Sequence, residues 1–205
     1  MNSTDIKLVK MSRRAILILL IAGQSFAGHT AHSNTGQISP LSNAQILVIR
    51  HAEKPDIGEK LSDAGYARAN ACVKFFSNYK IDYIFANEQS HNSNRPAETV
   101  EPLAHALHLK VNKSFKNNEF AELAAYLENG TFAGKTILIC WHHGEIPELL
   151  NSLGCDANSL LPPKGKWPKT VFGWLVQIKY DAAGIAHATV INEHLMPDDV
   201  DQKEQ

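Results

Sequence analysis

Short apolar runs alternate with amphipathic segments along most of the chain, and the first and third of these runs end abruptly in charged or histidine residues. Runs rich in β-branched residues predict strands at 46–49, 81–85 and 136–139, with a short strand at Val111. The spacing of apolar residues between them predicts helices at about 62–79, 96–107, 119–127 and 147–153. Strands that alternate with helices form parallel βαβ units, so we expect the carboxyl ends of these strands at one edge of a sheet.

The last part of the chain has a different pattern. Two apolar runs, 171–180 and 185–191, are separated by Asp181-Ala182-Ala183-Gly184, which is typical of a hairpin turn. We expect this hairpin to extend the sheet with an antiparallel pair. The acidic residues from Asp198 to Glu204 predict a disordered tail.

The first 27 residues have the order of a secretory signal. A basic region precedes the apolar run 15–22, and small residues at Ser25 and Ala27 predict cleavage after Ala27. A membrane anchor is the alternative, but this run is shorter than the about 20 residues that a span needs. A signal that began at Met11 would also be complete. We therefore expect an exported protein, periplasmic or secreted and free of the membrane after cleavage, with a flexible leader at 28–43, one domain at 44–196 and the tail at 197–205.

Composition narrows the possible partners. The chain has 20 basic and 21 acidic residues, without the basic excess typical of nucleic-acid binding, so no nucleic-acid partner is expected. Of the three cysteines, Cys72 and Cys140 lie in apolar patterns that predict buried thiols. In an exported protein one pair among Cys72, Cys140 and Cys155 could be oxidised, and the odd number leaves at least one cysteine free or in an intermolecular bond.

The candidate chemistry lies where the predicted strands end. Arg50 and His51 directly follow the first strand, and they offer a planar fork for phosphate oxygens and a nucleophilic imidazole. Arg95 begins the second predicted helix, and His142 and His143 follow the strand at 136–139. A structural role is the simpler explanation for any one of these residues. Their recurrence at one edge of a parallel sheet favours a phosphate site.

Four motifs give the chain a resemblance to a known family. Arg50-His51-Ala52-Glu53-Lys54, the stretches 61–69 and 95–104, and the stretch 140–147 resemble, in order, those of the histidine phosphatase superfamily, the phosphoglycerate-mutase-like group. The resemblance spans about residues 45–191. It implies a three-layer α/β/α sandwich with a mostly parallel sheet, and a phosphate pocket that needs neither a metal nor a cofactor.

The resemblance also implies the roles of the site residues. His51 is expected to form a phosphohistidine while Arg50, Arg95 and His143 hold the phosphoryl oxygens, His143 as an imidazolium, and Glu53 and His142 are expected among the substrate-binding residues. An alternative alignment exchanges His142 with His143.

The residue that protonates the leaving group is left open between two candidates, Glu145 and Glu119. Some relatives place an acid directly after the second histidine, where this chain has Gly144. Substrates with good leaving groups, such as phosphohistidine, would need no strong acid.

These expectations describe an exported, metal-independent phosphatase acting on a phosphomonoester or a phosphoramidate. Only 47 residues lie between Arg95 and His143, which leaves no room for a cap domain and predicts an open pocket for a small phosphorylated substrate or a phosphoprotein. One alternative is a protein of the same fold that binds a phosphorylated ligand without turnover. Another is a metal protein using His142, His143 and the leader histidines, but these lack the spacing of ligands on a common face.

Overall fold

A six-stranded sheet in the order β3-β2-β4-β1-β5-β6 forms the centre of the fold. The computed structural model describes residues 39–89, 93–161 and 164–199, which belong to one unit of residues 36–205. The predicted signal, leader residues 28–38 and tail residues 200–205 lie outside the described residues. The parallel strands are β1 (Gln45–Arg50), β2 (Tyr83–Ala86), β3 (Val111–Asn112) and β4 (Thr136–Trp141). The antiparallel strands β5 (Trp174–Tyr180) and β6 (Ala186–Asn192) form the predicted hairpin.

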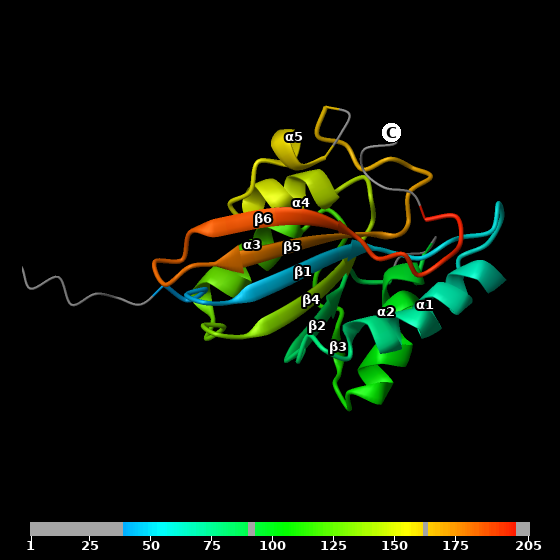
Figure 1. The fold of residues 1–205 in the computed structure, drawn as a ribbon, viewed down its shortest axis with the longest axis horizontal. Helices are drawn as coiled ribbons and strands as arrows, with labels where there is room; N and C mark the ends of the chain where they lie inside the picture. The colour runs from blue at the N-terminus through cyan, green and yellow to red at the C-terminus, as the bar shows by residue number, and fades with distance from the viewer. Residues whose placement is uncertain (1–38, 90–92, 162–163, 200–205) are drawn as a thin grey trace, which may run out of the picture. The chain divides into compact units, whose positions relative to one another are not determined.

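Helices cover both faces of the sheet (Figure 1). On one face lie α1 (Asp63–Phe76) and α2 (Arg95–Ala106), and on the other lie α3 (Phe120–Asn129), α4 (Ile146–Ser152) and α5 (Ala157–Leu160). The predicted α/β/α sandwich with a mostly parallel sheet is therefore confirmed.

The alternation of side chains along β1 explains why the sheet is buried on both faces. Ile46 and Val48 pack with α3 and α4, whereas Leu47 and Ile49 pack with α1 and α2. Successive side chains of a strand point to opposite faces, so a strand covered on both faces must be apolar throughout. By the same alternation, Arg50 lies on the face of Ile46 and Val48, at the carboxyl end of the strand.

Helix α1 is tied closely to the loop that follows β1. The hydroxyl of Ser62 accepts the N–H of Gly65 at 3.2 Å, which confirms the predicted N-cap. A Cβ at position 65 would lie 2.3 Å from the carbonyl oxygen of Glu53, so only glycine allows this close approach. The helix is thus held directly beside the segment that carries His51.

The ends of the domain differ from the sequence expectation. Leu41 and Ser42, which were expected in the flexible leader, are buried, and the N–H of Asn43 bonds the carbonyl oxygen of Asp181. Asp199, expected in the disordered tail, has a side chain only 3% exposed that pairs with Arg68. The domain therefore extends beyond the expected boundaries at both ends, because contacts with distant segments stabilise short stretches that look flexible in sequence.

Cys72 and Cys140 are buried as predicted, and the three cysteines are free thiols in the structure.

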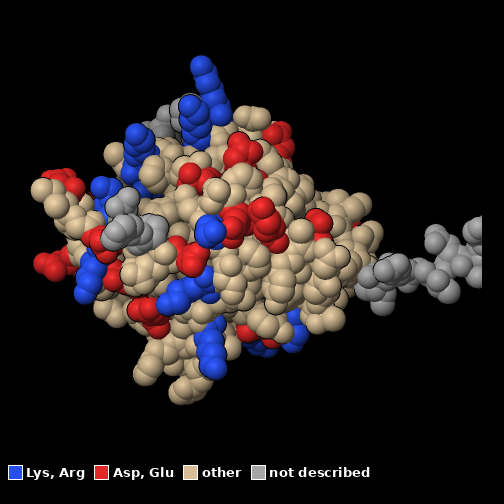
Figure 2. Space-filling view, turned by 180° about the vertical axis from the view of Figure 1, so that it is seen from behind, with Lys and Arg blue, Asp and Glu red and all other residues tan. Residues whose placement is uncertain are grey.

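On the face seen in Figure 2, basic and acidic side chains are interspersed. Within the described ranges, no helix has the length and apolar character needed to cross a bilayer.

Candidate active site

The carboxyl ends of β1 and β4 bring three histidines together. These strands are neighbours, and the N–H of His51 bonds the carbonyl oxygen of Trp141 at 3.1 Å. The ring centroid of His51 lies 5.0 Å from that of His142 and 6.4 Å from that of His143. The prediction that parallel topology places them at one site is therefore confirmed.

His51 is held in one tautomer by its own loop. Its Nδ1 atom lies 2.7 Å from the carbonyl oxygen of Ala52, which can only accept, so Nδ1 carries the proton and Nε2 keeps its lone pair. The N–H of Ala52 donates to Thr99 Oγ1 at 2.9 Å, and that hydroxyl donates to the carbonyl oxygen of Arg95. Helix α2 thus holds Ala52, the residue whose carbonyl oxygen orients the imidazole.

Electrostatics keep this imidazole neutral. His51 is only 2% exposed, and burial, followed by the positive charge of Arg50, lowers its pKa to about 3. A neutral imidazole with a free Nε2 is the nucleophilic form.

Arg50 has one half of its guanidinium fixed and the other half directed to the site. Its Nη1 donates to three backbone carbonyl oxygens of the 168–171 loop, at 2.8–3.2 Å, and its Cζ lies 3.8 Å from the ring centroid of Phe172. Nη2 lies 3.5 Å from Nδ1 of His143, and the buried Nε has no hydrogen-bond partner among the described residues. Burial lowers the pKa of Arg50 to about 9. The Nε and Nη2 edge is therefore the one that a phosphate can bind.

Arg95 is half-buried at the first turn of α2. Its guanidinium donates to the carbonyl oxygens of Gly58 and Lys60 and to Ser93 Oγ. It lines a cavity of about 340 Å³ at this sheet edge together with Ser93, Asn117, His142, His143, Gly144 and Glu145. Its positive charge contributes to lowering the pKa values of His51 and His142. Arg95 therefore lines one cavity with His142 and His143, and its charge also acts on His51.

His142 and His143 are neutral near pH 7 in the ligand-free protein. Burial, followed by Arg95 for His142 and by Arg50 for His143, lowers the pKa of each to about 4. His143 is therefore a neutral imidazole near pH 7 rather than the expected imidazolium, because burial and the positive charge of Arg50 disfavour its charged form. A bound anion would favour the charged form of both histidines and raise both pKa values.

Two predicted residues have other partners. Both carboxylate oxygens of Glu53 accept hydrogen bonds from Arg68, at 2.7–3.1 Å, so the expected role of Glu53 in substrate binding is corrected to that of an ion-pair partner. Glu119 accepts the N–H of Lys116, which is the largest cause of its lowered pKa. Glu145 lines the cavity and Glu119 is not among the residues that line it, so the structure favours Glu145 as the proton donor.

Arg68 and the backbone carbonyls of the 168–171 loop support the site, although neither was predicted from the sequence. Arg68 is 3% exposed and pairs with Glu53 and Asp199, each at 2.7 Å. It belongs to the buried face of α1, with Gly65, Ala69, Cys72 and Phe76. A charged residue on the apolar stripe of a helix indicates a buried ion-pair partner, so the burial of Arg68 could have been predicted from the sequence. No sequence pattern indicated that the backbone carbonyl oxygens of the 168–171 loop accept hydrogen bonds from Arg50.

Comparisons with known proteins add only distant likenesses. No family profile and no curated protein sequence matches the chain.

In the described part of the chain, no group of three or more histidine, cysteine or acidic side chains is arranged to hold a metal ion.

Several solved structures resemble this one. A putative phosphohistidine phosphatase SixA from Agrobacterium tumefaciens is 15% identical, with 72% of this chain and 96% of that chain covered and a TM-score of 0.49. A phosphoserine phosphatase from Entamoeba histolytica is 16% identical, with 75% and 100% covered and a TM-score of 0.49. A phosphoglycerate mutase from Plasmodium falciparum is 17% identical, with 78% and 98% covered and a TM-score of 0.48. At these identities and scores, the assignment of a function rests on the side chains of the site.

Proposed function

We propose that this protein is an exported phosphatase of the histidine phosphatase superfamily that hydrolyses a phosphomonoester or a phosphoramidate through a phosphohistidine on His51. The observation that carries the proposal is the bond from His51 Nδ1 to the carbonyl oxygen of Ala52, in a site that also holds two arginines. This bond leaves Nε2 unprotonated, with its lone pair available, in a site whose arginines can bind phosphate. Export is inferred from the signal-like first 27 residues.

In the first step, Nε2 of His51 attacks phosphorus. A P–N bond forms as the bond to the leaving oxygen or nitrogen breaks, and the electron pair of that bond goes to the leaving group. Arg50 and Arg95 stabilise the charge that spreads over the equatorial oxygens. His143, whose Nδ1 lies 3.5 Å from Arg50 Nη2, is placed to bind one of these oxygens with Arg50.

Glu145 is the residue that we assign to proton transfer. When protonated it would donate to the leaving group, and as a carboxylate it would accept a proton from the water that hydrolyses the phosphohistidine. Its place in the cavity with Arg95, His142 and His143 supports this role. We assign His142, whose ring lies edge-on to His51, to substrate binding.

Hydrolysis of p-nitrophenyl phosphate with a chelator present tests the proposal. Wild type should release p-nitrophenol, His51→Ala should lose turnover, and His187→Ala should keep it because His187 is an exposed residue of β6. Turnover that survives in His51→Ala would contradict the mechanism. Wild type that binds phosphate without turnover would favour a binding protein of the same fold.

A further inference from the structure

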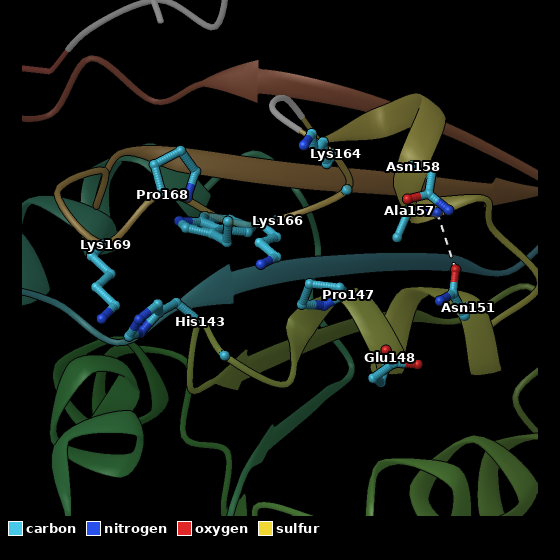
Figure 3. Close-up of a pocket in the computed structure, with 13 residues that line it drawn as sticks. His143, Pro147, Glu148, Asn151, Ala157, Asn158, Lys164, Lys166, Pro168 and Lys169 are labelled. Carbon is cyan, nitrogen blue, oxygen red and sulfur yellow. Dashed lines mark hydrogen bonds between the residues drawn. The ribbon is translucent and has the colours of Figure 1, made fainter.

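A second and larger cavity lies beside the phosphate site. It has a volume of about 610 Å³ and shares His143 and Gly144 with the smaller cavity. In Figure 3, Pro147, Glu148 and Asn151 of α4 lie along one side and Lys164, Lys166 and Lys169 along the other. A phosphoryl group alone would leave this space empty, since cavities of this size enclose whole small ligands.

The charge of the cavity is strongly positive on one side. Lys164, Lys166 and Lys169 are exposed, and Glu148 is the acidic residue among those that line the cavity. Lys169 extends toward His143 in Figure 3, and its charge is one of those that lower the pKa of His143. A negative group in this cavity would therefore lie within electrostatic reach of the phosphate site.

The loop that carries the lysines is fixed to the catalytic arginine. Carbonyl oxygens of Pro168, Lys169 and Val171 accept hydrogen bonds from Arg50 Nη1. The indole of Trp167 is 3% exposed, and its Nε1 donates to the carbonyl oxygen of Val171 at 2.9 Å. The backbone between the lysines is therefore held in place before a ligand binds, which reduces the entropy lost on binding.

Gly165 also helps to hold the loop that carries the lysines in place. It has a φ of +70°, and a Cβ there would meet the backbone nitrogen of Asn158 at 3.1 Å. Only glycine combines this conformation with the close packing on α5. Between the lysines and α4, the cavity presents the apolar surfaces of Pro147, Trp167 and Pro168.

We infer that this cavity binds the non-reacting part of the substrate, and that this part carries a second anionic group, a phosphate or a carboxylate, which Lys166 and Lys169 recognise. The inference rests on the proposed phosphatase function. It names a substrate class: phosphorylated compounds with a further negative group separated from the reacting phosphate by a short apolar or sugar-like spacer.

Phosphonates, which the enzyme cannot hydrolyse, provide the test. Titration calorimetry would compare alkylene bisphosphonates of increasing chain length with alkyl monophosphonates of the same length, at physiological salt. One length of bisphosphonate should bind about five- to tenfold tighter than its monophosphonate, which exceeds the statistical advantage of about two for a ligand with equivalent ends. Phosphonocarboxylates of that length would show whether a carboxylate is accepted in place of the second phosphate.

Matched variants decide whether the lysines are responsible. Lys166→Gln/Lys169→Gln should remove the preference for the bisphosphonate, whereas Lys179→Gln, which changes an exposed lysine of β5, should retain it. Equal affinities at every length, or a preference that survives in the double variant, would overturn the inference. Failure of the proposed function would appear separately, as absent turnover of p-nitrophenyl phosphate.

Discussion

The Nδ1 atom of His51 lies 2.7 Å from the carbonyl oxygen of Ala52, and the N–H of the same residue donates to Thr99. Ala52 therefore fixes the tautomer of the imidazole through its carbonyl oxygen and contacts helix α2 through its N–H. Since α2 begins at Arg95, the proposed nucleophile His51 and the proposed second phosphate-binding arginine are linked through Ala52 and Thr99.

Anion binding should take up protons. The pKa values of His142 and His143 are about 4 in the ligand-free protein, and an anion between them and the arginines would raise both. At pH values above about 4, the complex then binds more protons than the protein without the anion. The affinity for the anion should therefore rise as the pH falls from about 8 toward 4. Calorimetry with sulfate, which remains a dianion over this range, measures both the affinity and the proton uptake. An affinity that does not change with pH would contradict the assigned pKa shifts.

Glu145 should matter most for substrates with poor leaving groups. For phenyl phosphate, Glu145→Gln should lower kcat about a hundredfold, the usual contribution of a general acid, whereas p-nitrophenyl phosphate should be affected much less. Glu119→Gln serves as the control, because the carboxylate of Glu119 is engaged by Lys116. Equal losses on the two substrates would exclude Glu145 as the proton donor.

The two adjacent histidines should differ in their contributions. His143→Asn removes the imidazole beside Arg50 Nη2, and kcat/KM should fall about a hundredfold or more through weaker transition-state stabilisation. His142→Asn changes a ring that contacts the edge of His51, and it should act mainly on KM. Steady-state kinetics on p-nitrophenyl phosphate would compare them, and the reverse order of effects would assign the catalytic role to His142.

The buried ion pairs of Arg68 should contribute strongly to stability. Arg68→Met leaves the carboxylates of Glu53 and Asp199 without their partner, so unfolding should require about 3–5 kcal/mol less free energy. Lys135→Met is the matched control, because its pair with Asp82 is partly exposed and should contribute at most about 1 kcal/mol. Denaturant unfolding measures both, and similar losses would show that the buried network is not a major source of stability.

Local patterns predicted much of the fold and of the site. The apolar runs at β1 and β4 specified buried parallel strands, and parallel topology alone placed His51 near His142 and His143. Ser62 marked the start of α1 because its hydroxyl caps the helix. These features depend on neighbours in sequence or on the rule that parallel strands share an edge.

Contacts between segments that are distant in sequence could not be predicted from local sequence patterns. Asp199 pairs with Arg68, 131 positions away, and the 168–171 loop binds Arg50 through backbone carbonyls, which every residue possesses. Such contacts appear only when the chain has folded.

The end of helix α1 differs for a local reason. The helix ends at Phe76 rather than near Tyr79, and the N–H of Tyr79 bonds the carbonyl oxygen of Phe76 in the turn that follows.

Trapping of the phosphoenzyme tests the central claim most directly. Wild type mixed with radiolabelled p-nitrophenyl phosphate and quenched in base should retain label that is stable in base and lost in acid, as expected of phosphohistidine, and the label should map to the peptide that contains His51. His51→Ala should retain none, while His187→Ala should be labelled like wild type. Label on another residue, or turnover by wild type without any base-stable intermediate, would contradict the assignment of His51 as the nucleophile.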